Sequence, residues 1–272
     1  MSHEKYFEIL QNELNLIVRR ESAMNKKNAF DLPTRVFHWV FAILFVAAFT
    51  IANTIDDDSK WYTLHSLSGI MMVFLIFLRG IWGFVGSKYA RFSSFKLNPS
   101  DLIKYLKSIF SSKTKRDLGH NPASSYAAIL MFIFTIGLGA TGILMSKGIN
   151  KHFFEEVHEL CANGFIFTVI AHIVGVVFHQ VKHKDGLAFA MTSGKKEEVD
   201  GQQEIASNHP FIAIVFIGLF TSFGIYLNNN FERDTQKLNL FGSSIELGED
   251  EHSQSGRHSS RKRDHDDDHD DD

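Results

Sequence analysis

The stretch VFHWVFAILFVAAFTIANTI (Val36–Ile55) is twenty residues long and contains no Asp, Glu, Lys or Arg. A helix rises about 1.5 Å per residue, so about twenty residues cover the hydrocarbon core of a bilayer, which is about 30 Å thick. The stretch is therefore predicted to be a transmembrane helix. It starts too late and runs too long for a cleaved signal peptide, so we expect it to remain as a membrane anchor.

Four further runs in the 272-residue chain also lack charged residues: Trp61–Leu78, Pro122–Met145, Leu160–Val181 and Phe211–Leu227. The last run is the shortest. An isolated membrane segment must satisfy its own backbone hydrogen bonds, which a helix does. The sequence therefore predicts an all-α integral membrane protein with five transmembrane helices.

The distribution of Lys and Arg predicts the orientation of these helices. The segments before, between and after the first four runs carry six, one, nine, two and four Lys and Arg residues in order. Loops rich in Lys and Arg stay in the cytoplasm. We therefore expect a multi-pass protein of a bacterial inner (cytoplasmic) membrane, with a cytoplasmic N-terminus and a periplasmic C-terminus.

The two ends of the chain differ from its middle in composition. Residues 1–29 are predicted to form a cytoplasmic extension, in which one face of an amphipathic helix carries Phe7, Leu10, Leu14 and Ile17. A translation start at Met24 is an open alternative. Residues 196–230 are expected to supply a cytoplasmic loop and the fifth helix. Residues 231–272 are rich in Asp and His, and we expect an acidic, disordered tail on the exoplasmic side.

Four of the fourteen histidines lie inside the predicted spans or at their edges: His38, His65, His158 and His172. The predicted directions of the helices place His65 and His158 near the outer end, and His38 and His172 near the inner end. Since His172 follows His158 by fourteen residues, it lies about 21 Å deeper and only about 40° around the same helix. One helix face thus presents one imidazole to each leaflet.

Two imidazoles at equal depth can ligate a haem iron axially, and a helical bundle can solvate the apolar edge of the ring. Zinc would require three or four ligands at one point, and a proton relay would require carboxylates, which the spans lack. His179 is an alternative inner ligand, since it lies seven residues beyond His172. Small residues follow the histidines (Gly69, Ala162 and Gly175), either to admit a macrocycle or to pack helices closely. The lone Cys161 excludes an internal disulfide and a covalently attached c-type haem.

Several motifs in order resemble those of bacterial cytochrome b561 and of the b-type cytochrome subunit of nickel–iron hydrogenase. They span about residues 30–195 and are PTRVFHW (33–39), LHSLSG (64–69), RGIWGFVGSKYARF (79–92), GHNP (119–122), VHEL (157–160), AHIVGVVFH (171–179) and DGLAFAM (185–191). The resemblance implies a four-helix haem-binding core in residues 30–195 with two non-covalent b haems. Its axial ligands fall on His38, His65, His158 and His172.

The resemblance implies electron transfer between quinone and a partner redox protein, which would be a c-type cytochrome or a hydrogenase. Quinol-linked oxidoreductase activity and a homodimer are left open, and no feature indicates nucleic-acid binding. A metal-handling membrane protein is the alternative from another class, with His252, His258, His265 and His269 of the tail as a cation trap.

Three further residues near the inner end are candidates for contacts with quinone or with a haem propionate: Arg35, Trp39 and Arg79. Arginine donates well to such oxygens, although membrane-edge arginines also reach water without any such role. His120 precedes a predicted helix cap and is interpreted as a loop residue. The acidic loop Asp56–Asp58 and the acidic tail predict an outer surface suited to a basic partner.

Overall fold

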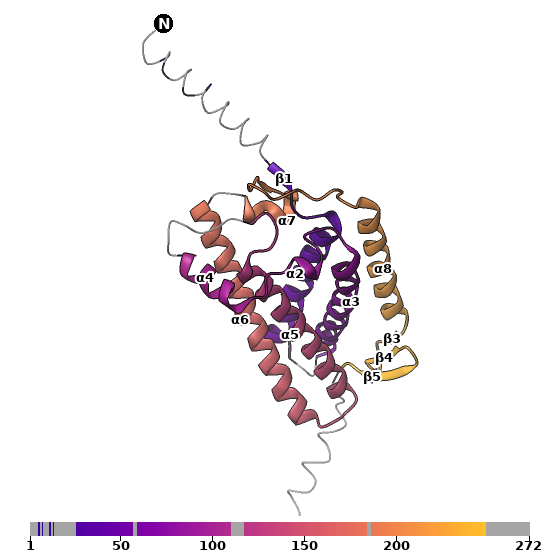
Figure 1. Ribbon diagram of the computed structural model, residues 1–272. Helices are drawn as coiled ribbons and strands as arrows, with labels where there is room; N and C mark the ends of the chain where they lie inside the picture. Colours follow the sequence, from indigo (N-terminus) through magenta and orange to yellow (C-terminus); the bar gives the residue numbers. More distant parts are fainter. Residues whose placement is uncertain are drawn as a thin grey trace, which may run out of the picture.

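The computed structural model describes residues 26–56, 59–109, 117–183 and 186–248, together with the isolated positions 5, 7, 11 and 13. Within these residues, five helices are long and apolar enough to cross a membrane. They are α2 (Leu32–Thr54), α3 (Thr63–Val85), α5 (Pro122–Ser146), α6 (Lys151–His183) and α8 (Pro210–Asn229), shown in Figure 1. The predicted helical membrane fold is confirmed. Of the predicted N-terminal amphipathic face, all but Phe7 lies outside the described residues.

Two of the long helices begin with the same local signal. The side chain of Asp31 accepts a hydrogen bond from the Thr34 amide at 2.9 Å, and Asn121 accepts one from the Ser124 amide at 2.8 Å. In both helices a proline occupies the first turn. These contacts satisfy amides that the first turn leaves without a partner, so the starts of α2 and α5 are fixed by local sequence.

Two helices are longer than the charge-free runs that predicted them. α3 continues through Arg79 to Val85, and α6 begins at Lys151 instead of Leu160. The 33 residues of α6 span about 50 Å, which exceeds the hydrocarbon thickness. A charge-free run therefore marks the apolar part of a helix, while charged turns extend it at either end.

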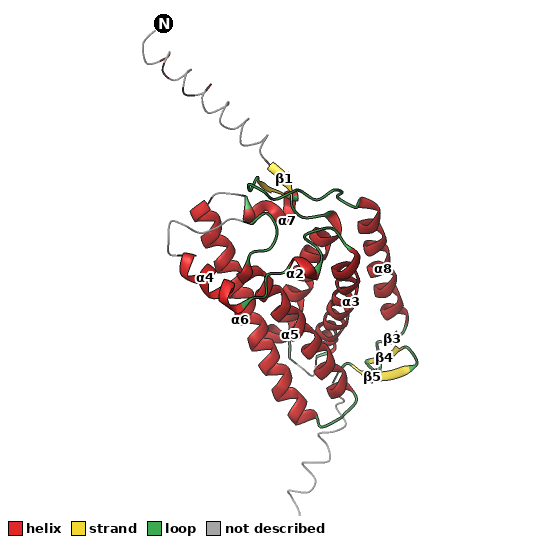
Figure 2. Cartoon of the chain, in the orientation of Figure 1, coloured by secondary structure: helices red, strands yellow, loops and turns green. Residues whose placement is uncertain are grey.

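Helices α2, α3, α5 and α6 form the bundle, in which α2 packs on α3, α3 on α5, and α5 on α6 (Figure 2). α8 lies on the outside of α2 and α3. There the ring of Phe223 stacks on that of Phe74, with 4.2 Å between their centroids. A shorter helix, α4 (Pro99–Ile109), packs on α5. The fifth long helix is thus an addition to a four-helix core.

Glycines set the closest helix contacts in this core. A Cβ atom at Gly164 would lie 2.6 Å from the ring of Phe134, and one at Gly139 would overlap Val73. At Gly137 the nearest atom is Sγ of Cys161, at 3.0 Å. Close packing therefore explains Gly137 and Gly139 of α5.

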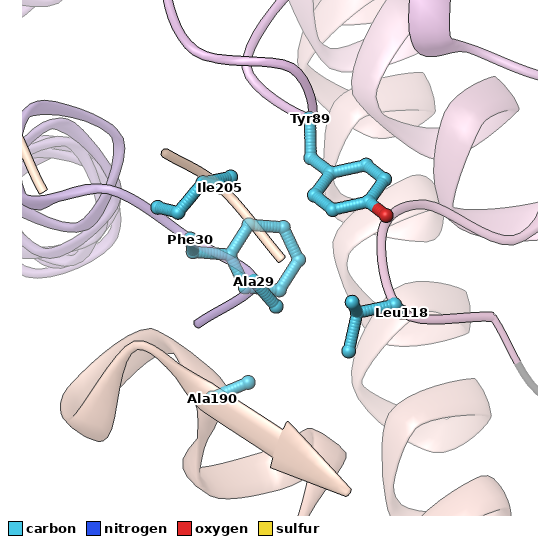
Figure 3. Packing of buried hydrophobic residues seen from close by; sticks show 6 residues of the cluster. All are labelled: Ala29, Phe30, Tyr89, Leu118, Ala190 and Ile205. Atoms are coloured by element: carbon cyan, nitrogen blue, oxygen red, sulfur yellow. The ribbon is translucent and has the colours of Figure 1, made fainter. Parts of the chain in front are cut away.

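One end of the bundle is closed by segments distant in sequence, which we name the cap. Strand β1 (Lys26–Asn28) pairs antiparallel with β2 (Lys195–Glu197). Beside them lie two short helical turns, η3 (Leu187–Phe189) and α7 (Ala190–Ser193). Figure 3 shows the buried cluster beneath the cap, made of Ala29, Phe30, Tyr89, Leu118, Ala190 and Ile205. The boundary predicted at residue 29 thus lies inside a folded element.

The opposite end carries a small antiparallel sheet, which we name the end sheet. It consists of β3 (Phe231–Glu232), β4 (Lys237–Leu240) and β5 (Ser243–Glu246). Its apolar residues Leu238, Ile245 and Leu247 are buried with Leu227 against α3. The predicted disorder is therefore wrong for residues 231–246, because an averaged composition concealed a short apolar segment. Residues 249–272 lie outside the described part of the chain.

Candidate functional site

At the end-sheet end of the bundle, two of the predicted histidines face each other. His65 lies in the first turn of α3 and His158 in the second turn of α6. Their ring centroids are 6.3 Å apart, and their planes are inclined by 64°. The structure thus brings together the two histidines that the sequence paired by depth.

Hydrogen bonds fix which nitrogen of each ring is protonated. Nδ1 of His65 lies 3.0 Å from the carbonyl oxygen of Ala48, which can only accept. Nδ1 of His158 lies 2.8 Å from Oγ1 of Thr141, whose own hydrogen is directed to Gly137 O at 2.8 Å. Both Nδ1 atoms therefore donate, so each Nε2 keeps its lone pair. This is the state in which a histidine ligates a metal.

The separation of the two rings fits a metal between them. Metal–imidazole bonds are about 2 Å long, so two nitrogens on opposite sides of one metal are about 4 Å apart. The ring centres lie roughly 1 Å further back on each side, which gives about 6 Å between centroids. The observed 6.3 Å agrees with this value.

The second pair, His38 of α2 and His172 of α6, lies toward the cap. The two rings are within coulombic range of each other, and both are half-buried. α6 packs extensively on α5, whereas it meets α2 through large side chains, such as the rings of Phe45 and Phe165 with centroids 4.9 Å apart. The space between α2 and α6 is therefore bridged by side chains such as these.

His179, the alternative inner ligand, has a different environment. Its side chain is only 5% exposed, and its Nδ1 lies 3.3 Å from the hydroxyl of Tyr105 on α4. Its ring lies 4.5 Å from that of His183. Of these two histidines, His172 is the one that acts electrostatically on His38.

Some of the small residues next to the histidines face open space. A Cβ atom at Gly69 or Gly175 would meet no atom of the described chain within 4 Å; Gly69 is half-buried, whereas Gly175 is exposed on the outside of α6. This contrasts with Gly139 and Gly164, which are in close contact with neighbouring side chains. No group of three or more His, Cys, Asp or Glu side chains that could hold a metal ion occurs within the described ranges. The donors present therefore fit a flat macrocycle held by two nitrogens.

The three candidate contact residues differ in their surroundings. Arg35 donates to Thr192 O at 2.7 Å, and the indole N–H of Trp39 donates to Met191 O at 3.0 Å, so both hold the cap segment. Trp39 is nevertheless 48% exposed. Arg79 is 3% exposed; its Nη2 donates to Ala90 O at 2.8 Å, and Nη1 has no hydrogen-bond partner among the described residues.

His120 belongs to this region, although the sequence indicated only a loop residue. Its ring lies edge-on to Phe30 at 5.5 Å and to Phe95 at 4.8 Å. Burial, assisted by the charges of Arg79, Lys196 and His172, lowers the pKa of His120 to about 3. The only sequence signal was its place in GHNP (119–122), next to the Asn121 cap, which suggested a turn and not a buried imidazole.

The model of the prokaryotic cytochrome b561 family matches residues 29–194, which is more than half of the chain. The chain belongs to this family. Proteins described as a probable Ni/Fe-hydrogenase 1 B-type cytochrome subunit, from two strains of Escherichia coli, are 22% identical over 139 residues. That alignment covers 43% of this chain and 58% of theirs. No solved structure matches the chain.

Membership in the cytochrome b561 family identifies a multi-pass membrane b-type cytochrome, and the family implies haem b as its prosthetic group. The site described above fits this group, because His65 and His158 offer neutral imidazole nitrogens in a facing pair within an apolar bundle.

Proposed function

We propose that the chain holds two b haems, one between His65 and His158 and one between His38 and His172, and that it passes electrons across the membrane between quinone and a partner protein. The observation that carries this proposal is the facing pair His65–His158, at 6.3 Å and with both Nδ1 atoms engaged. A quinol-linked oxidoreductase activity would follow from the same arrangement.

The spacing of the ligands along α6 supports two haems. His158 and His172 are separated by fourteen residues of one helix, or about 21 Å, so a single macrocycle cannot use both. The haem groups supply the one-electron chemistry. The protein contributes the ligands, their fixed tautomers and an apolar surrounding that excludes water, and each of these sets the potential of the site.

Quinone is proposed to react at the cap end, beside Trp39. Its exposed indole lies at the start of α2, and its ring centroid is 5.4 Å from that of His38. A quinone headgroup that reaches Trp39 from the lipid would therefore come close to the inner ligand. Arg35 lies one turn before Trp39 and adds a positive charge that favours a reduced, partly anionic quinone.

The partner protein is proposed to dock at the end-sheet end. This end carries the exposed Asp56 and is followed in sequence by the acidic residues of the tail. Such a surface attracts a basic c-type cytochrome, and the attraction weakens with salt. A hydrogenase is the second candidate partner, because the Escherichia coli relatives are described as hydrogenase cytochrome subunits. We further propose that this end is periplasmic in a bacterial inner membrane.

Haem quantification of the purified chain tests the proposal. A pyridine haemochrome assay and a reduced-minus-oxidised spectrum should give two b haems per chain. A fully loaded preparation with one haem per chain would contradict the pairing. A colourless protein that binds zinc or nickel would instead support the metal-handling alternative.

Stopped-flow kinetics test the two ends separately. Replacing Arg35 or Trp39 by Ala should slow reduction by quinol, while oxidation by a basic cytochrome should slow with rising salt and after truncation behind residue 248. Unchanged quinol kinetics in both variants would remove the quinone site. Salt-independent and truncation-insensitive oxidation would remove the acidic docking surface.

A further inference from the structure

We infer that Arg79 and His120 together form a carboxylate-binding site under the cap, and that its occupant is a propionate of the haem held by His38 and His172. This inference rests on the proposed function, since it requires a haem at that pair. It assigns to His120 a role that its sequence context did not indicate.

The first half of the site is the buried guanidinium of Arg79. Its Nη2 is held by Ala90 O, but no acceptor in the described ranges reaches its Nη1. Asp31, the acid that interacts with Arg79, is already committed, because it accepts from the Thr34 amide and from the indole of Trp82. A buried charged donor without a partner is costly. A guanidinium presents donors in a fork that suits a carboxylate.

The second half is the imidazole of His120. Its Nε2 is buried and likewise meets no hydrogen-bond partner in the part of the chain that the structure describes. A chain of ring contacts joins it to Arg79. Arg79 lies over Phe92 at 5.6 Å, Phe92 lies 5.6 Å from Phe95, and Phe95 lies 4.8 Å from His120. Arg79 and His120 are also within coulombic range. The two unsatisfied groups thus lie along one run of aromatic contacts and interact electrostatically.

The charges around this enclosure favour an anion. Two buried cations, Arg79 and Lys196, act on His120, and the buried acid in this region is Asp31. Lys196 itself is held by the carbonyl oxygen of Asp117. The carboxylate that interacts with Arg79 in the described chain is that of Asp31, which already accepts two hydrogen bonds. An added carboxylate would balance the charge of Arg79.

The position of the site identifies the carrier of this carboxylate. His120 is within coulombic range of His172, so a molecule bound at the inner pair can bring a carboxylate to this site. Haem b carries two carboxylates on its rim and meets this condition. A quinone must enter from the lipid, whereas the site is covered on the cap side by Phe30, Tyr89 and Leu118, all of them buried. A haem propionate and a quinone at this site would give different results in the experiment below.

The experiment compares haem b with its dimethyl ester, which lacks the negative charges. The full-length chain with His65→Ala is stripped of haem and reloaded with either form, so that only the inner pair is occupied. Release to an excess of apomyoglobin is then timed. We expect the ester to leave roughly tenfold faster than haem b, as the loss of a charge-assisted hydrogen bond implies.

The variants Arg79→Gln and His120→Phe should each reduce this difference, and together they should abolish it. The matched control is Arg91→Gln, which removes an exposed arginine at the same end and should keep the full difference. A second readout is the midpoint potential of the inner haem, which should fall in Arg79→Gln because a positive charge near the haem stabilises its reduced form. Arg79→Lys keeps the charge without the fork and should lower the potential less.

The outcomes separate the possibilities. The inference is overturned if the ester still leaves faster than haem b in both variants. It is also overturned if the variants speed the release of both forms equally, because that would indicate a structural role alone. Impaired quinol binding with unchanged haem release would assign the site to quinone and would also overturn the inference. If the reloaded chain binds no haem at all, the proposed function fails instead. If Arg79→Gln does not fold, the haem release measured in His120→Phe and the midpoint potential measured in Arg79→Lys test the inference instead.

Discussion

Thr141 of α5 holds His158 of α6 through a 2.8 Å contact between its Oγ1 and Nδ1, while the same hydroxyl is bonded to Gly137 O. This contact fixes the tautomer and the direction of the ring. Thr141→Val removes the acceptor and keeps the shape of the side chain. We expect the affinity for the haem between His65 and His158 to fall roughly 10- to 100-fold, as for other partners of metal-bound histidines.

Haem release and spectroelectrochemical titration would measure this effect, and the haem nearer the cap should stay unchanged. Thr135→Val is the matched control. Thr135 is buried on the same helix, and among the residues that the structure describes its hydroxyl bonds only to Met131 O, at 2.7 Å. If both variants weaken the haem equally, Thr141 acts through helix packing and not through His158.

The pairing of the histidines predicts which ligands share a haem. His65→Ala and His158→Ala should each remove the same haem, and His38→Ala and His172→Ala should each remove the other. His179→Ala should retain both, because this side chain is bonded to Tyr105. Haemochrome ratios and low-temperature spectra of the five variants would check this. Loss of a haem in His179→Ala with two haems kept in His172→Ala would reassign the inner ligand.

Two glycines should respond oppositely to the addition of one methyl group. Gly139→Ala places its Cβ against Val73 and should destabilise the chain by about 1–3 kcal/mol with or without haem. Gly69→Ala meets open space and should leave the haem-free chain unchanged, while it weakens haem binding if the macrocycle fills that space. Denaturant unfolding of the haem-free and loaded chains separates the two. An equal loss in both variants would contradict this interpretation of Gly69.

Acid should destabilise the chain through His120. Its pKa is about 6.5 in the unfolded chain and about 3 in the folded chain, so between these values the unfolded state binds more protons. Stability is therefore full above pH 6.5 and declines as the pH falls toward 3, by an amount on the order of a few kcal/mol. Unfolding of the haem-free chain at pH 7 and pH 4 measures it. His120→Gln should flatten this decline, and an unaltered pH dependence would contradict the assignment to His120.

Reporter fusions test the orientation. A fusion at residue 24 should report a cytoplasmic location, and one after residue 248, behind the end sheet, a periplasmic location. This follows from the alternating Lys and Arg content of the loops. A cytoplasmic signal from the second fusion would mean that α8 does not cross the membrane, which leaves four spanning helices.

The bundle and the facing of His65 and His158 could be predicted from sequence because both depend on local regularities. Charge-free runs of sufficient length mark membrane helices, and a constant rise per residue converts positions in sequence into depths. The same reasoning underestimated α6, since its first turns carry Glu155, Glu156 and Glu159 and lie beyond the apolar part.

The cap, the end sheet and the burial of His120 could not be predicted in this way. Each depends on contacts between distant segments, such as β1 with β2, or Leu238 with the residues of α3. Periodicity and composition describe one segment at a time. They therefore do not show which short apolar stretch packs against another segment, or which loop histidine becomes buried beneath such a stretch.

The pairing of β1 with β2 also orders events during synthesis. Lys26 cannot meet Glu197, nor Asn28 accept from the Ile205 amide, until the ribosome has passed residue 194, where the match to the cytochrome b561 family ends. At ~5–20 residues per second this takes on the order of ten seconds or more. By then α2 through α6 have all been made, including His38 and His172. The cap is therefore the last part of this domain to close, and the interval before its closure is a loading window in which the prosthetic group can enter from that end.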